Sequence, residues 1–158
     1  MDLLIRHATP QDTGTVFHLV QQLAIYEKLE REMVASEADF RNALFGERRL
    51  AEALLAFADE VPVGLALYFR TFPTFIGRAG LHLEDLFVEP AHRSKGIGKA
   101  LLRRLGQIAK QENLGRIEWT VLTWNQPSID FYHHLGAVTM EDWRVCRLGG
   151  DALNKLAE

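Results

Sequence analysis

The sequence predicts an α/β (α+β) fold with a mixed, mostly antiparallel central sheet flanked by helices. Two apolar runs, residues 53–58 and 62–72, are separated by only a few residues, which is typical of an antiparallel hairpin. A long amphipathic segment then connects strand-like residues 81–88 to strand-like residues 116–122, and a helical crossover of this length joins parallel strands. There is no internal repeat and no linker, so we expect one domain over residues 1–158.

The N-terminal part is predicted to contain one short strand and two helices before the hairpin. Residues 3–6 form the strand. The first helix begins at Thr9 and Pro10, because threonine can cap the free amides and proline suits the first helical position. The second begins at Ser36 and ends at Gly46 for corresponding reasons. The buried face of the first helix consists of apolar residues at helical spacing, Val16, Leu19, Val20, Leu23 and Ala24.

The C-terminal part alternates strands and helices. The strand at residues 81–88 leads into a glycine turn and a long helix. Residues 116–122 form the next strand, residues 127–135 a short helix that Gly136 ends, and residues 143–148 a late strand. The apolar face of the long helix is formed by Ile97, Leu101, Leu102, Leu105 and Ile108.

Composition and charge exclude several classes of function. Hydrophobic residues make up 47% of the chain and charged residues 25%, which is ordinary for a globular protein that folds around its own core. The formal net charge of -3 disfavours nucleic acid as a partner, since phosphate binding needs a positive field, and mildly favours a cationic substrate. No apolar run approaches the length of a membrane span, and the N-terminal residues do not resemble a signal peptide.

The single cysteine, Cys146, cannot form an internal disulfide. This suits a reducing compartment, so we expect a cytoplasmic protein. Because Cys146 lies within the late strand-like run, we expect it to pack there rather than to act as a nucleophile. His133 and His134 do not form a metal pair, because adjacent helical residues diverge, and no other metal-binding pattern is present.

The most informative segment is the glycine turn, whose residues are Arg93-Ser94-Lys95-Gly96-Ile97-Gly98-Lys99. Glycines let the backbone approach a ligand closely, and the first turn of the following helix offers free N–H groups and a positive dipole end. Three basic side chains add positive charge, so the turn suits a pyrophosphate. A Rossmann fingerprint is excluded by Leu101, and the Walker spacing is absent. An ordinary turn before a helix is the alternative interpretation.

Arg93-x-x-Gly96-x-Gly98 resembles the acyl-CoA signature of the GNAT superfamily of N-acetyltransferases. The similarity extends over nearly the whole chain, and it includes an asparagine, a Phe-Tyr pair and a Gly-Ala pair at the second half of the cofactor site. Within the superfamily the chain is most similar to the diamine acetyltransferases, of the spermidine/spermine and thialysine type. The segments that carry this similarity are Leu23-Ala24-x-Tyr26-Glu27, Leu83-Glu84-Asp85 and Trp124-Asn125-x-Pro127-Ser128-Ile129.

The resemblance implies a GNAT-like sheet whose parallel pair is splayed at the acyl-CoA site. It also implies transfer of acetyl from acetyl-CoA to a primary amine of a small molecule by direct attack in a ternary complex, and a homodimer. The backbone of Leu86, Phe87 and Val88 would pair with the pantetheine amides as an added strand does. The remaining residues implied to bind the cofactor are Arg93, Ser94, Lys95, Gly96, Ile97, Gly98, Lys99, Asn125 and Ser128.

The resemblance also implies catalytic roles for two residues. Glu84 would accept the proton of the amine, directly or through water, and Tyr132 would protonate the departing thiolate. From the residues alone, Glu84 could be a solvated acid and Tyr132 a core side chain. His82 shares a strand face with Glu84 and is a rival base. By strand alternation Glu84 should point away from its neighbour Asp85.

Tyr26 and Glu27, with Glu84 and Asp85, are implied to line the amine site, where acids and an aromatic face suit an ammonium group. The chain departs from the polyamine enzymes at residues 72–75. The corresponding loop is acidic in those enzymes, whereas in this chain it carries no carboxylate. A short diamine or an amino-acid side chain therefore fits better than a long polycation. The alternatives are a non-catalytic acyl-CoA-binding module, an acetyltransferase for a protein or peptide amine, and an interaction domain with an unused glycine turn.

Overall fold

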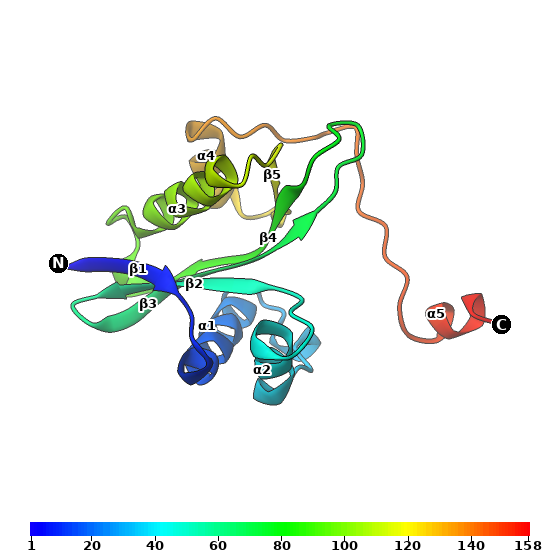
Figure 1. The fold of residues 1–158 in the computed structure, drawn as a ribbon, viewed down its shortest axis with the longest axis horizontal. Helices are drawn as coiled ribbons and strands as arrows, with labels where there is room; N and C mark the ends of the chain where they lie inside the picture. The colour runs from blue at the N-terminus through cyan, green and yellow to red at the C-terminus, as the bar shows by residue number, and fades with distance from the viewer. The chain divides into compact units, whose positions relative to one another are not determined.

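A five-stranded sheet forms the centre of residues 1–120, and its strands lie in the order in which they occur along the chain. The computed structural model describes residues 1–158, of which residues 121–158 form a second compact unit. The strands are β1 (Leu3–His7), β2 (Glu52–Ala58), β3 (Val61–Thr71), β4 (Gly80–Val88) and β5 (Ile117–Glu118). The first four are antiparallel to their neighbours and β5 is parallel to β4, which confirms the predicted mixed sheet (Figure 1).

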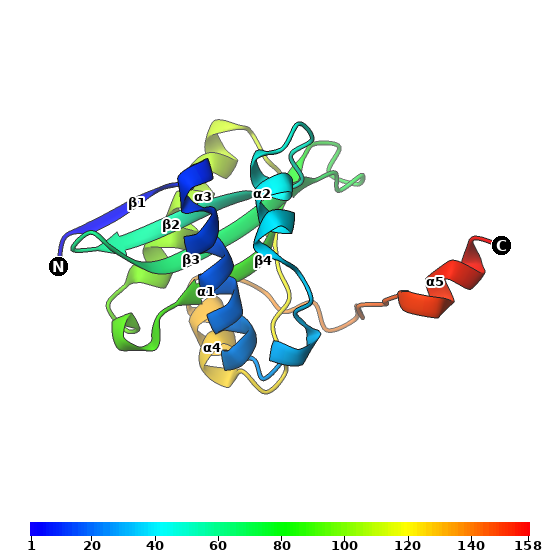
Figure 2. The same ribbon diagram turned by 90° about the horizontal axis from the view of Figure 1, so that it is seen from below.

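Helices cover both faces of this sheet (Figures 1 and 2). One face packs against α1 (Thr13–Tyr26) and α2 (Glu37–Phe45), and the other against α3 (Ile97–Gln111). Each face has its own apolar cluster, called here the α1 cluster and the α3 cluster. Short 3-10 turns connect the elements at η1 (Pro10–Asp12), η2 (Glu30–Glu32) and η3 (Pro90–His92).

The second helix begins at the predicted cap, Ser36, whereas Thr9 caps the 3-10 turn η1, and α1 itself begins only at Thr13. The backbone N–H of Thr9 donates to the carboxylate of Asp12 at 2.7 Å, and Ser36 makes the corresponding bond to Asp39 at 2.7 Å. The first cap carries an additional ion pair, because Arg6 on β1 also bonds Asp12 at 2.7 Å. The Arg6 guanidinium, helped by Thr9, lowers the pKa of Asp12 to about 2. This cluster fixes the path of the chain from the sheet into α1.

The predicted hairpin is formed by β2 and β3. Asp59 and Glu60 make the turn with positive φ angles of 48° and 68°, the backbone conformation of the two-residue turns that match strand twist. Both are non-glycine residues, and the backbone N–H of Asp2 donates to the Asp59 carboxylate at 2.8 Å. The turn thus connects the start of the chain to the hairpin.

Strand β4 contains a β-bulge at Glu84. Tyr68 on β3 pairs with Leu83, and the preceding residue, Leu67, pairs with Asp85, so Glu84 has no partner opposite it. An extra residue of this kind interrupts the alternation of side chains along a strand.

The bulge changes which β4 side chains face each helix layer. Before it, Leu83 belongs to the α3 cluster; after it, Leu86 packs against that same cluster although it is three residues further on. Phe87 belongs to the α1 cluster. Asp85, two residues before Phe87 and opposite a residue of the α1 cluster, therefore also faces α1.

The parallel pairing of β4 and β5 is short. It contains two residue pairs, Leu81 with Ile117 and His82 with Glu118. The strand predicted at residues 116–122 is correct in place but shorter, because the pairing ends just before the bulge changes the course of β4. After His82, the edge of β4 that faces β5 has no hydrogen-bonded partner strand.

The second unit contains α4 (Gln126–His134) and α5 (Gly150–Leu156). The predicted helix at residues 127–135 is confirmed, and Gly136 follows it with a φ of 95°. The predicted late strand at residues 143–148 is wrong, because no strand of the sheet provides partners for its N–H and C=O groups. Cys146 is exposed, so its expected packing in that strand is wrong as well.

No helix of the chain combines the length and the apolar character that crossing a bilayer requires.

The Arg6–Asp12 pair is expected to contribute more stability than the otherwise similar cap at α2. Asp12→Asn should lower Tm at pH 7 by a few degrees, since loss of a helix cap costs about 1 kcal/mol and the arginine loses its partner too. Asp12 has a lowered pKa, so its contribution is present above about pH 4 and is lost as the pH falls toward 2.

Thermal unfolding of Asp12→Asn between pH 7 and pH 3 tests this expectation. The matched control is Asp39→Asn, which removes the same capping contacts where no arginine is bound. An equal loss of Tm in the two variants, or a difference that does not narrow below pH 4, would show that the ion pair adds nothing.

Candidate functional site

The charges of two carboxylates act on a third where the bulge of β4 faces the C-terminal end of α1. Asp85 faces α1 directly, and the negative charges of Glu84 and Glu27 both act on it. Glu27 is the residue that follows α1. The expectation that Glu84 points away from Asp85 rested on strand alternation, which the bulge interrupts at that point.

Asp85 is the most perturbed acid of the chain. Burial first, and then repulsion from Glu84 and Glu27, raise the pKa of its carboxyl from 3.8 to about 7. Burial also raises the pKa of Glu27. A half-buried carboxyl whose neighbouring charges are both negative binds either a proton or a cation. An ammonium group bonded there would replace the proton.

Glu84 lies at the more open side of this group. Its carboxylate is 3.4 Å from Nε2 of His82, and the side chains of the two residues are 54% and 27% exposed. The ring of His82 also packs on Phe69 with centroids 5.0 Å apart. The 3.4 Å contact agrees with the expectation that His82 and Glu84 share a face, and both side chains are partly exposed to solvent.

Arg93, the first residue of the glycine turn, folds back onto the same region. Its Nε donates to the carbonyl oxygen of Val88 at 2.9 Å. Its guanidinium lies over the ring of Tyr26, 4.2 Å from the centroid, and 5.6 Å from the centroid of Phe87. Tyr26 is the last residue of α1, so this one side chain joins the turn, the end of β4 and the end of α1.

The glycine turn leads directly into α3. Ser94 and Gly96 have positive φ angles of 61° and 81°, and Gly96 is the N-cap. A side chain at Gly96 would meet nothing within 4 Å, so its backbone angle, not crowding, favours glycine there. The first helical bond runs from the N–H of Ala100 to the carbonyl of Gly96 at 2.9 Å. The preceding N–H groups are therefore free of intrahelical partners and can receive an anion.

The side chains of the turn divide into two groups. Ile97 is buried in the α3 cluster and anchors the helix start, so only its backbone is available to a ligand. Lys95 and Lys99 are exposed. The residues present thus fit a diphosphate held by backbone amides with lysines beside it.

The segment Leu86, Phe87 and Val88 has one edge bonded to β3 and no ladder with β5 on the other. Phe87 and Leu86 are fixed in place by packing into opposite clusters. Their positions suit the predicted pairing with an extended amide-bearing ligand, because an unpaired strand edge offers alternating donors and acceptors.

The remaining predicted residues lie in the second unit. Asn125 is the N-cap of α4, and its Oδ1 accepts from the N–H of Ser128 at 3.4 Å, which is the capping role considered from the sequence. Tyr132 is on the same helix, with its ring 5.5 Å from that of Phe131. Their roles toward a cofactor stay predictions.

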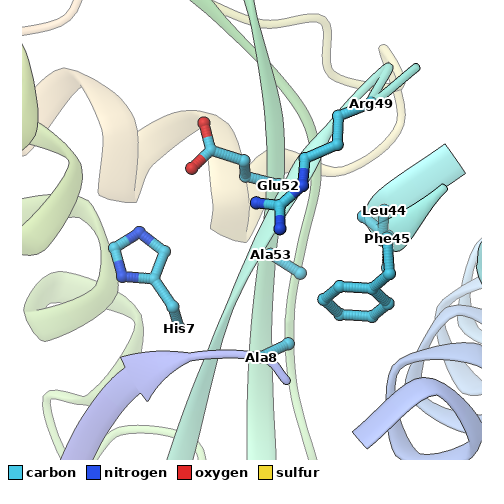
Figure 3. A pocket seen from close by; sticks show the side chains of 7 residues that line it. All are labelled: His7, Ala8, Leu44, Phe45, Arg49, Glu52 and Ala53. Atoms are coloured by element: carbon cyan, nitrogen blue, oxygen red, sulfur yellow. The ribbon is translucent and has the colours of Figure 1, made fainter. Parts of the chain in front are cut away.

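A pocket of about 150 Å³ lies away from these residues, where β1 ends, β2 begins and α2 ends. Figure 3 shows the Phe45 ring and the Arg49 side chain directed toward it. The Nε2 of His7 is 3.1 Å from the hydroxyl of Tyr68, and Glu52 is paired with Arg70. No sequence signal identifies this pocket, since its walls come from separate segments, His7, Ala8, Leu44, Phe45, Arg49, Glu52 and Ala53.

Comparison with known proteins gives a consistent result. The sequence profile of the acetyltransferase (GNAT) family matches residues 17–137. An L-ornithine N5-acetyltransferase of Arabidopsis thaliana is 30% identical, over 96% of this chain and 86% of its own length. A thialysine N-epsilon-acetyltransferase of Bos taurus is 32% identical, over 98% and 97%. Among solved structures, an integron cassette protein of V. cholerae superposes with a TM-score of 0.82 at 29% identity, covering 100% of this chain and 99% of its own.

The raised pKa of Asp85 predicts a particular dependence of stability on pH. Between about pH 4 and 7 the folded state keeps a proton that the unfolded state has released, so folding loses stability as the pH rises through this window. Asp85→Asn removes this cost, which is on the order of 2 kcal/mol after allowance for the remaining solvent contact. The variant should therefore raise Tm at pH 8 by roughly 4–8 °C and have little effect at pH 4.

Thermal unfolding of both proteins from pH 4 to pH 8 measures this difference. Asp142→Asn serves as the control, since it removes an exposed carboxylate that does not act on Asp85. A stabilisation by Asp85→Asn that does not grow with pH would mean that Asp85 is ionised normally.

Proposed function

The chain belongs to the GNAT family of acetyltransferases, and on that basis we propose that it transfers acetyl from acetyl-CoA to a primary amine of a small molecule in a ternary complex. The observation that carries the choice of acceptor is the group of three carboxylates at the bulge of β4. A half-buried carboxyl whose neighbouring charges are both negative suits an ammonium group. Relatives whose names specify ornithine and thialysine, both amino acids with a side-chain amine, support the same class.

Acetyl-CoA would be held by elements that are already in place. The free N–H groups at Gly96, Ile97, Gly98 and Lys99 would receive the diphosphate, and the exposed lysines of the turn would add charge. The open edge of β4 would pair with the amides of the pantetheine arm. In this arrangement the thioester end extends along β4 toward the bulge, where the carboxylates lie.

The amine must lose a proton before it can attack the thioester carbonyl. An alkyl ammonium has a pKa of about 10.4, so it is almost entirely charged at pH 7. Asp85 and Glu27 would bind the ammonium form, and Glu84, directly or through a water molecule, would accept the proton as nitrogen attacks. His82, whose Nε2 is 3.4 Å from the Glu84 carboxylate, is the alternative acceptor, or would receive that proton from Glu84.

Tyr132 would act on the departing thiolate. A tyrosine hydroxyl is protonated at neutral pH and can donate to a thiolate as the carbon–sulfur bond breaks. Asn125 and Ser128, two turns and one turn before it, would bond the cofactor in addition to beginning α4. The homodimer and the cytoplasmic location expected from the sequence stay predictions.

The loop between β3 and β4 supports a short acceptor. Phe72 and Phe75 are 65% exposed and fully exposed, respectively, and the loop at residues 72–75 carries no acid that could bind a second, distant ammonium group. We therefore propose a short diamine or an amino acid with a side-chain amine as the substrate, in preference to a long polyamine.

Release of free thiol from acetyl-CoA, measured over a panel of amines, tests the proposal. Ornithine, lysine, thialysine and short diamines should be acetylated with a higher kcat/KM than spermidine or spermine, because the loop lacks the additional acid. Turnover confined to a peptide amine would assign a protein or peptide substrate. Thermal stabilisation by acetyl-CoA without turnover on any amine would identify a binding module, and the proposed enzyme activity would be wrong.

Tyr132→Phe should lower kcat by about a hundredfold or more, since a positioned proton donor contributes a factor of this order. Binding of acetyl-CoA, measured by calorimetry, should change little because the ring is retained. Tyr68→Phe is the matched control: it removes a buried hydroxyl that contacts His7 on the α3 side of the sheet, and it should leave kcat unchanged. Full activity of Tyr132→Phe would exclude this residue as the donor.

A further inference from the structure

We infer that Arg93 positions the amine site as well as belonging to the cofactor turn. This inference rests on the proposed function, and it assigns to Arg93 a role in acceptor recognition that acts through Tyr26. The observation behind it is the path of the Arg93 side chain, which leaves the turn and ends on the aromatic ring at the end of α1.

The contacts of Arg93 hold its guanidinium in one orientation. The bond from Nε to the Val88 carbonyl fixes one side of the group, and the ring of Tyr26 covers its face at 4.2 Å. Phe87 provides a second ring at 5.6 Å. A planar guanidinium can make the bond and the stacking contact together, whereas the ammonium of a lysine can make only a point contact.

This stacking determines which face of the Tyr26 ring an acceptor amine could contact. An ammonium group placed over the same ring face would be repelled by the guanidinium already there. Tyr26 therefore does not offer that face to the substrate. Its contribution is to hold the end of α1, and with it Glu27, at the correct distance from Asp85 on β4.

The positive charge of Arg93 also lies at the C-terminal end of α1, where the helix dipole is negative. The turn that binds the cofactor is thereby linked to the acids that bind the amine through one side chain. A change in the turn reaches Glu27 through the ring of Tyr26. If Arg93 instead contributed only charge to the diphosphate, its loss would weaken the binding of acetyl-CoA and leave the binding of the amine unchanged.

A double-mutant cycle separates these two roles. Arg93→Lys keeps the charge and removes the planar contact, and Tyr26→Leu removes the ring. Each variant should raise KM for the amine about tenfold at saturating acetyl-CoA, and the double variant should raise it no further, because both remove the same contact. Tyr26→Phe keeps the ring, so combining it with Arg93→Lys should leave the effect of Arg93→Lys undiminished.

Lys95→Gln is the matched control for charge, since Lys95 is an exposed basic residue of the same turn. It should raise KM for acetyl-CoA and leave KM for the amine nearly constant. Multiplicative effects of Arg93→Lys and Tyr26→Leu, or an Arg93→Lys variant altered only in KM for acetyl-CoA, would overturn this inference while the proposed function stands. A wild-type protein that acetylates no amine would instead overturn the proposed function, and this inference with it.

Discussion

The arrangement of the candidate site depends on one residue without a partner in the sheet. Because Glu84 is an extra residue in β4, the strand changes which side chains it presents to each helix layer. Leu83 and Leu86 both pack toward α3, and Asp85 is thereby placed on the side of α1. A regular strand would direct Asp85 and Glu84 to opposite faces, and the acids would not act together. The parallel ladder with β5 ends immediately before the bulge, so the same irregularity accompanies the open edge.

Gathering acids in this way is unfavourable for the folded chain, and the structure shows how the cost is limited. Asp85 keeps a proton near neutral pH, Glu84 remains largely exposed, and Glu27 lies at a helix end. The apolar clusters on both faces of the sheet supply the compensating stability. Acids whose pKa values are shifted in this way cluster at functional sites, where ligand binding rather than folding stability selects the residues.

Most of the framework could be predicted from the sequence. Capping residues located the starts of η1 and α2, apolar periodicity located α1 and α3, and the crossover after β4 indicated the parallel pair. These signals are local, and each depends on a few neighbouring residues. The glycine turn was likewise visible because positive φ angles and free helix amides have a sequence signature.

The rest depended on contacts that sequence patterns do not encode. A bulge is a property of the register between two strands, so the sequence of β4 alone did not indicate where alternation is interrupted. The stacking of Arg93 on Tyr26 joins residues far apart in the chain, and only folding brings them together. Residues 143–148 alternate as a strand does, but alternation cannot supply the neighbouring strand that would bond them.

The proton held by Asp85 has one more consequence. Burial and the negative charges of Glu84 and Glu27 raise the pKa of this carboxyl to about 7, so in the proposed function an arriving ammonium group would take the place of the proton. A proton and the acceptor amine would therefore compete for the Asp85 carboxyl. In the proposed function, mild acidification would therefore weaken acceptor binding and mild alkalinity would strengthen it.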